Sequence, residues 1–218
     1  MLFFTLFILL GFLAMQVPFS RLIGAENMRF SLFDFYGPIA GAFVGSVWGM
    51  VTVFLMQAIN WAVRGFALDL PTLLRFLPIL FGVLFFAKKS KLMLAVPLIA
   101  MIGFWMHPEG RQAWYFALYW LIPIVAYVWH DKFLFARALG ATFTQHSVGG
   151  LLWVWALNMK ASLWIGLTPI VWKERLLMAA GITVTYMVFT YVLSAVFKKF
   201  NLQLPRVSLN PKYSVHAR

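Results

Sequence analysis

The chain has 218 residues, of which 63% are hydrophobic and only 11% are charged. An average soluble domain has about 45–50% apolar and about 25% charged residues, so this composition argues against a soluble globular protein. The absence of cysteine excludes disulfides, thiolate metal sites and cysteine nucleophiles. The net charge of +12 falls in short clusters between apolar runs, which is typical of a membrane protein and not of a nucleic-acid-binding one.

Long apolar runs alternate with short polar breaks along the chain. A bilayer core is about 30 Å thick, so a spanning helix needs about 20 mostly apolar residues. The runs cover 2–18, 37–63, 72–87, 92–106, 112–129, 134–157 and 168–197. Because several runs are shorter than this, we predict an all-α polytopic transmembrane bundle of six to eight hydrophobic segments, some of them short or re-entrant. Residues 1–197 are expected to form one domain, and residues 198–218 a basic cytoplasmic tail.

The first two runs leave the number of spans open. Run 2–18 has no positive residue before it and no small-residue cleavage pattern after it, so we expect a retained helix. Run 37–63 would form a helix of about 40 Å if it were continuous. A break near Gly45 and Ser46 would instead give two short helices, and the span count then rises from seven to eight.

Basic residues in the loops predict the orientation, since cytoplasmic loops carry an excess of Lys and Arg. The two sides hold 12 and 6 basic residues with seven spans, and 10 and 8 with eight. Both schemes place the cluster Lys88–Lys91, Lys132 and the C-terminus in the cytoplasm. Both place 107–111 and 158–175 outside, so we expect an integral protein of the inner or plasma membrane.

Four glycines, Gly37, Gly41, Gly45 and Gly49, repeat at a spacing of four residues. On one helix they would form a single stripe that lets another helix approach closely in lipid. The stripe could serve internal packing, which is the more common use, or it could be a docking face for a partner membrane protein.

The most polar stretch within an apolar run is Gly140–Gly150, which contains Gln145 and His146. His146, Gly150 and Trp153 have the spacing of one helical face, so they could form a flat cleft for a planar ring. A buried histidine that links two helices by a hydrogen bond explains the same residue equally well.

Polar residues also mark the ends of other runs. Thr168-Pro169 is typical of a helix start, with Glu174 and Arg175 in the second turn as either an interfacial ion pair or an acid and a base at the mouth of a pocket. The turn 107–111 is followed by aromatic residues, which favours an interfacial aromatic belt. Asp34 precedes the glycine repeat, and capping of a helix N-terminus explains it without a function.

Several catalytic and cofactor-binding motifs are missing from the sequence. It contains no His-Glu-x-x-His zinc motif, no Gly-x-Ser-x-Gly nucleophile elbow and no phosphate-binding loop. The four histidines are scattered, and we see no nucleophile–base pair. We therefore expect neither an enzyme nor a bound metal or cofactor.

Two stretches resemble the S components of energy-coupling factor (ECF) transporters. The run Phe30–Gly49, with its apolar stretch, small-residue turn and Gly-x-x-x-Gly-like spacing, is similar to the region of their second and third helices. Residues 140–150 and 168–177 are similar to their fifth and sixth helices. The resemblance covers about half of the chain, and its glycine- and leucine-rich motifs are moderately specific.

The resemblance implies a substrate-binding membrane subunit that captures a vitamin or similar micronutrient from outside. It also implies a transmembrane coupling subunit as partner, which carries two cytoplasmic ATPases. The implied pocket residues are His146, Trp153, Asn158, Glu174, Arg111, Trp114 and Tyr115. Two alternatives remain from the residues alone: an intramembrane enzyme that uses His146 and Glu174, and a structural membrane subunit without a ligand.

Overall fold

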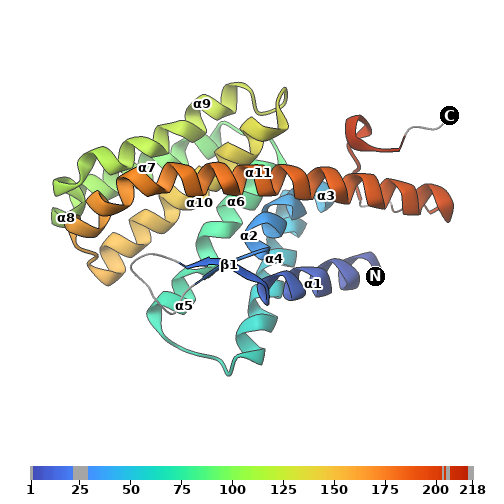
Figure 1. Ribbon diagram of the computed structural model, residues 1–218, viewed down its shortest axis with the longest axis horizontal. Helices are drawn as coiled ribbons and strands as arrows, with labels where there is room; N and C mark the ends of the chain where they lie inside the picture. The colour runs from blue at the N-terminus through green and yellow to red at the C-terminus, as the bar shows by residue number, and fades with distance from the viewer. Residues whose placement is uncertain (1, 22–28, 203, 205–206, 216–218) are drawn as a thin grey trace.

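The protein is a bundle of helices with one small β-ribbon (Figure 1), and its computed structural model describes residues 2–21, 29–202, 204 and 207–215. The first half contains α1 (Leu2–Met15), β1 (Pro18–Arg21), β2 (Arg29–Ser31), α2 (Phe33–Tyr36), the 3₁₀ turn η1 (Gly37–Ile39), α3 (Ala40–Val44), α4 (Ser46–Val63), α5 (Leu70–Leu74) and α6 (Phe76–Ala87). The second half contains α7 (Leu92–Met106), α8 (Pro108–Gln112), the 3₁₀ helix η2 (Trp114–Leu121), α9 (Ile122–Val128), α10 (Leu134–Leu157), α11 (Ala161–Lys199) and η3 (Pro211–Tyr213). The helical class is confirmed, whereas the antiparallel β1–β2 ribbon was not predicted.

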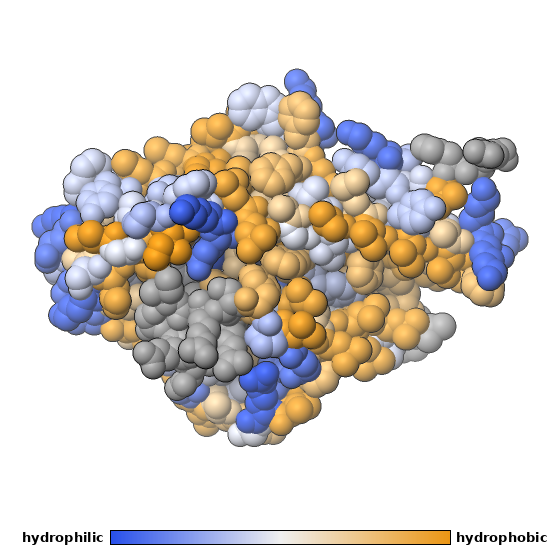
Figure 2. All heavy atoms as spheres, viewed as in Figure 1, coloured by the Kyte–Doolittle hydropathy of each residue, from blue (hydrophilic) through white to orange (hydrophobic). Residues whose placement is uncertain are grey.

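Three helical segments in the described part of the chain are long and apolar enough to cross a membrane: Ser46–Val63, Leu70–Ala87 and Ala161–Lys199. Large apolar side chains also remain exposed over much of the surface, and Leu92 keeps 80% of its area accessible. Figure 2 shows hydrophobic residues over much of one face, with many of the most hydrophilic ones toward its left end, its lower edge and the tip of α11. These features indicate an integral membrane protein.

The glycine repeat is divided between two helices, because the chain turns sharply at Gly45. This residue has φ 84° and ψ 167°, a backbone conformation that glycine adopts at little cost. The expected single stripe on one helix is therefore wrong, and the alternative of a break at this point is confirmed. Gly41 and Gly49 now face each other, since a Cβ on Gly49 would lie 2.6 Å from the Gly41 Cα.

Gly37 is also used within the chain, because a Cβ there would lie 2.6 Å from the Ile79 side chain. Of the four glycines only Gly45 is exposed. The repeat lets α3, α4 and α6 pack closely against one another. Docking of a partner on these glycines stays a prediction, and no exposed stripe supports it.

The loops of the second half gather at two opposite ends of the bundle. At the lysine end, defined by Lys88–Lys91 and Lys132, Arg137 donates hydrogen bonds to the carbonyls of Phe86 and Ala87. At the opposite end, Glu109 accepts from the Lys160 ammonium at 3.0 Å and from the Ala161 N–H at 2.8 Å. These contacts tie neighbouring loops together, so α7, α9, α10 and α11 alternate in direction.

The first half follows the same alternation. The Gln16 amide after α1 donates to the Asn60 side chain near the end of α4 at 3.0 Å, so α1 and α4 run the same way. Gly41 in α3 lies against Ala87, at the lysine end. Within the described residues the chain thus crosses the bundle in the order of the eight-segment scheme, although α1 and α7 are only 14 and 15 residues long.

Helix α10 lies at the centre of the bundle and packs against α6, α7, α9 and α11. Two glycines permit its close approach to α6: the Gln145 side chain occupies the space over Gly82, and the Phe85 ring occupies the space over Gly140. A Cβ on either glycine would meet these side chains at 2.1–2.2 Å. Because its neighbours surround it, α10 can carry polar residues without exposing them to lipid.

The last helix begins seven residues earlier than expected. Helix α11 runs without interruption from Ala161, with Pro169 inside it, and the prediction that a helix starts at Thr168-Pro169 is wrong. The Thr168 hydroxyl instead donates to the Trp164 carbonyl of the preceding turn at 3.0 Å. Such a back-bond and an internal proline are tolerated in membrane helices, where neighbouring groups satisfy the backbone.

The segment after α11 folds back on the bundle where it is described. The Ser208 N–H donates to the Phe43 carbonyl at 2.8 Å, and the Val215 N–H donates to the Ser194 hydroxyl at 2.8 Å. The Tyr213 ring packs edge-on against Tyr186. This part of the predicted tail is therefore attached to α3 and α11, while Arg206 and Arg218 lie outside the described residues.

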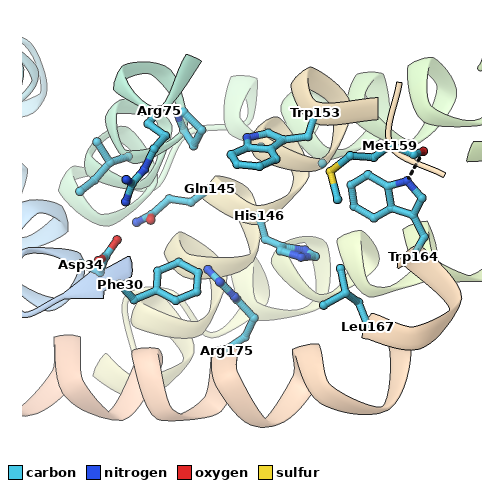
Figure 3. Close-up of a pocket in the computed structure, with 14 residues that line it drawn as sticks. Phe30, Asp34, Arg75, Gln145, His146, Trp153, Met159, Trp164, Leu167 and Arg175 are labelled. Atoms are coloured by element: carbon cyan, nitrogen blue, oxygen red, sulfur yellow. Dashed lines mark hydrogen bonds between the residues drawn. The ribbon is translucent and has the colours of Figure 1, made fainter. Parts of the chain in front are cut away.

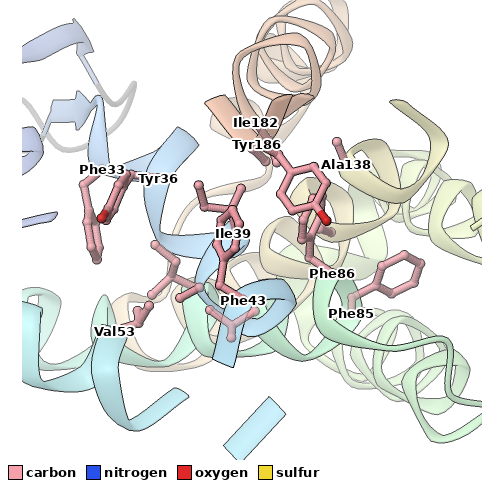
Figure 4. Close-up of a cluster of buried hydrophobic side chains, with 14 of the residues drawn as sticks. Phe33, Tyr36, Ile39, Phe43, Val53, Phe85, Phe86, Ala138, Ile182 and Tyr186 are labelled. Carbon is pink, nitrogen blue, oxygen red and sulfur yellow. The ribbon is translucent and has the colours of Figure 1, made fainter. Parts of the chain in front are cut away.

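Two hydrophobic clusters stabilise the bundle. The larger one joins α2, η1, α3, α4, α6, α10 and α11 around Ile39, Phe43 and Phe86, as Figure 4 shows. The second is aromatic and lies toward the opposite end, around Phe104, Phe116 and Trp120, which are 0% exposed. The space between these clusters contains the site described next.

Candidate functional site

A cavity of about 160 Å³ lies between the two clusters, and several elements contribute to its wall (Figure 3). Aromatic and aliphatic side chains form most of the wall, and a small number of polar groups point into it. Its lining residues are Phe30, Asp34, Arg75, Pro78, Ile79, Gln145, His146, Gly149, Gly150, Trp153, Met159, Trp164, Leu167 and Arg175. A mostly apolar cavity with convergent polar groups is the common form of a small-molecule site.

Helix α10 contributes the face that the sequence spacing indicated. His146, Gly150 and Trp153 all line the cavity, with Gln145 and Gly149 beside them. Gly150 is required for packing, since a Cβ there would lie 2.4 Å from the Trp120 ring. The glycine lets the Trp120 ring lie against α10 and contact His146. Figure 3 shows His146 among the side chains of the cavity wall.

The hydrogen bond from Trp120 defines the state of His146. The Trp120 indole N–H donates to Nδ1 of His146 at 2.9 Å. An indole nitrogen can only donate, so Nδ1 accepts and the ring proton lies on Nε2. His146 is thus held as a neutral imidazole, and its Nε2–H is a hydrogen-bond donor.

Arg175 reaches the cavity from α11 and is 5% exposed. Its Nη1 donates to the Thr142 hydroxyl at 3.3 Å, and its guanidinium lies 5.1 Å from the centre of the Phe30 ring. Its Nε has no hydrogen-bond partner among the described residues, and neither has Nε2 of Gln145. Buried donors without acceptors are rare, so their presence at one cavity is informative.

A second, more polar cavity of about 800 Å³ adjoins the first and shares Asp34, Arg75 and Ile79 with it. We call it the vestibule; its polar lining includes Gln16, Ser31, Gln57, Asn60, Arg64, Asp69 and Thr72. Hydrogen bonds from the Thr72 hydroxyl and N–H hold the pKa of the Asp69 carboxyl below its usual value. Asp34 accepts from the Ser31 N–H at 2.8 Å, so it stabilises the turn before α2 and also lies between the two cavities.

Five of the expected pocket residues lie outside this cavity. Asn158 ends α10 in the left-handed conformation, with φ 47°. Glu174 is half-buried beside Arg175 but does not line the wall. Arg111 is exposed and donates to the Trp105 carbonyl, Trp114 is 54% exposed, and Tyr115 is half-buried on η2. The structure therefore brings together His146 and Trp153 from that set and separates the others from them.

Several cavity residues were not predicted from the sequence: Phe30, Arg75, Met159, Trp164 and Leu167. Arg75 had a visible signal, because it is a charge inside the apolar run 72–87 and charges in such runs are costly. Trp164 lies near the end of an apolar stretch, a position typical of an interfacial residue, but it is 3% exposed and its indole donates to the Met159 carbonyl at 3.1 Å. Phe30 had no distinguishing signal, since the ribbon that carries it was not expected.

The arrangement is suited to binding. Among the described residues, no group of three or more His, Asp and Glu side chains could hold a metal ion. The acidic side chain in the cavity wall is Asp34, which accepts from the Ser31 N–H. His146 is instead hydrogen-bonded to Trp120. Comparison with known proteins adds no assignment, since no protein-family model, no curated protein and no solved structure matches the chain.

Proposed function

We propose that the protein is the substrate-binding membrane subunit of an uptake transporter, similar in role to the S components of ECF transporters. The observation that carries this proposal is the cavity inside the bundle, with aromatic walls and buried donors that lack acceptors. A site of this kind holds a small organic molecule by stacking and orients it by a few polar contacts.

The position of the cavity supports capture from outside. The cavity and the vestibule involve α5, the start of α11 and Met159, at the end of the bundle opposite the lysine end. Lys88, Lys89, Lys91 and Lys132 favour the cytoplasm for the lysine end. The vestibule would then open toward the outer surface, from which a nutrient arrives.

Transport also requires a partner, since the sequence has no phosphate-binding loop. We propose a transmembrane coupling subunit that carries two cytoplasmic ATPases. Apolar side chains exposed along α11, such as Val184, Val188 and Val192, supply surface that either lipid or such a subunit can cover.

The experiment is purification of the protein in mild detergent, followed by mass spectrometry of the small molecules and proteins that accompany it. We expect a small molecule at near-equal amount and an ATPase-linked membrane protein. Protein that is free of both, when it is purified from cells grown in rich medium, would refute the proposal. A matched sample of a Trp153→Ala variant should lose the small molecule and keep the protein partner.

The alternative enzyme that uses His146 and Glu174 as acid and base has no geometric support, because only His146 lines the cavity. If a protein partner but no small molecule accompanies the protein in the same purification, the result would favour a structural subunit without a ligand.

A further inference from the structure

Two buried hydrogen-bond donors beside the cavity have no acceptor among the described residues. Nε of Arg175 and Nε2 of Gln145 are buried, in side chains that are 5% and 7% exposed. In Figure 3, Gln145 extends toward Asp34 and Arg75, and the Arg175 guanidinium rises toward Phe30 and His146. Both residues line the cavity, although the Gln145 amide nitrogen packs over Gly82. An acceptor group beside the two side chains would satisfy their donors after a small local movement.

The charges around the cavity define the sign of that group. Its wall contains two arginines, Arg75 and Arg175, and one carboxylate, Asp34, while His146 is neutral because its Nδ1 accepts from Trp120. The wall itself therefore carries one positive charge in excess, because Glu174, the half-buried carboxylate beside Arg175, does not line it. A net charge buried in a membrane protein is costly, and one bound anion would neutralise it.

The remaining wall defines the size and character of the rest of the ligand. Met159, Trp164 and Leu167 lie on the side away from Gln145, and Trp153 lies between them and Gln145. The volume of about 160 Å³ is close to that of an engineered apolar cavity of about 150 Å³ that binds benzene. The space thus suits one ring, stacked among indole and aliphatic groups.

Resting on the proposed function, we propose that the ligand is a one-ring monocarboxylate, with its carboxylate beside the Arg175 guanidinium and the Gln145 amide and its ring toward Trp153 and Trp164. The planar guanidinium of arginine is well suited to carboxylates, and hydrogen bonds to ionised acceptors are the stronger kind. The vestibule offers such an anion a polar path past Arg64 and Arg75, so that it need not cross the lipid.

The test uses the full chain in lipid nanodiscs and isothermal titration with three matched acid and amide pairs. The probes are benzoate and benzamide, 4-aminobenzoate and 4-aminobenzamide, and nicotinate and nicotinamide; phenyl phosphate is a doubly charged probe of similar size. We expect at least one acid to bind about tenfold or more tightly than its amide, since the amide lacks the charge. Phenyl phosphate should bind more weakly than benzoate, because its second charge has no partner.

Two variants locate the preference. Arg175→Gln should abolish the preference for the acid, whereas Lys173→Gln removes the same charge from an exposed position two residues away and should keep it. Should Arg175→Gln fail to fold, the isosteric variant Gln145→Glu serves instead. It places a second carboxylate beside the carboxylate of the ligand. We expect the affinity for the acid to fall about tenfold or more and the affinity for the amide to change little.

Equal affinities for acids and amides, or no binding by any acid, would overturn the monocarboxylate proposal. A neutral molecule found in the purified protein would overturn it as well, while the transport proposal would survive. Conversely, a bound acid without any coupling partner would support the ligand class and count against the transporter. The two proposals therefore fail on different results.

Discussion

At the scale of single residues, the cavity depends on a few side chains whose packing sets their chemistry. Trp120 is fully buried, and its N–H determines which nitrogen of His146 carries the proton. Gly82 and Gly150 provide the space in which Gln145 and Trp120 lie. The donors in the cavity are therefore held in place by residues behind them.

Trp120→Phe tests this positioning. The change removes a buried hydrogen bond and part of a buried ring, so we expect a loss of about 2–4 kcal/mol in stability and weaker ligand binding. Trp155→Phe is the matched control, because that indole also donates a hydrogen bond, to the Gly103 carbonyl at 2.8 Å, but is 53% exposed. Thermal unfolding in detergent and ligand titration measure both effects; equal losses in the two variants would contradict the role given to Trp120.

A second residue prediction concerns Gly49. A Cβ at this position would collide with the backbone of Gly41, so Gly49→Ala should force α3 and α4 apart and lower stability by about 1–3 kcal/mol. Gly166→Ala, which meets no atom within 4 Å, should cause no loss. The unfolding temperatures of the two variants decide the matter, and equal tolerance of both would show that the α3–α4 contact is loose.

At the scale of elements, short loops fix helices against one another. Glu109, at the start of α8, joins this loop to Lys160 and to the first N–H of α11. Carboxylates are favourable at helix N-termini, where unpaired N–H groups and the helix dipole act together. The contact anchors the start of α11 and, through it, Trp164 and Leu167 of the cavity wall.

The Glu109 contact predicts a pH dependence. The hydrogen bonds from the Ala161 N–H and from Lys160 lower the pKa of Glu109 from its ordinary value of 4.5. Since the folded pKa is the lower one, the stabilisation is complete above the ordinary value and disappears as the pH falls through the folded one. We therefore expect Glu109→Gln to lower the unfolding temperature at about pH 7 and to have a shrinking effect in acid below about pH 4.5.

Lys160→Met serves as the control for that experiment, because it removes only one of the two partners of Glu109. It should give a smaller loss with the same disappearance in acid. A Glu109→Gln effect that is unchanged between pH 7 and pH 3 would show that the charge of the carboxylate is unimportant.

The sequence predicted the part of the cavity that lies on one helix but not the parts that distant segments contribute. Helical periodicity placed His146 and Trp153 on one face, and both line the cavity, because a single helix preserves such spacing. Phe30, Arg75 and Arg175 join them from three distant segments, and no local pattern reports how segments pack. Thr168-Pro169 resembled a helix start, but α11 continues through it, since tertiary packing can override a local preference.

At the scale of the whole molecule, the basic residues and the fold together predict a topology. The lysine end carries Lys88, Lys89, Lys91 and Lys132, and the opposite end carries the vestibule. The absence of cysteine makes this topology directly testable, because any cysteine introduced is the only one in the chain.

Lys132→Cys and Lys160→Cys place a thiol on an exposed residue at each end. In intact cells, a membrane-impermeant maleimide should label Lys160→Cys at once and Lys132→Cys only after permeabilisation, because cytoplasmic loops are the lysine-rich ones. Labelled protein on a gel is the measurement. The reverse labelling pattern would show the opposite membrane topology, in which the vestibule opens to the cytoplasm.

Helix α11 has a consequence for the surrounding lipid. With 39 residues it is about 58 Å long, whereas the 15 residues of α7 extend only about 22 Å. No single hydrocarbon thickness matches both lengths, so a bilayer that both helices crossed would thin beside α7, while α11 would tilt or extend beyond it. The bilayer around the protein would then be locally deformed. The thickness of the surrounding lipid would be one of the variables that set the tilt of the bundle.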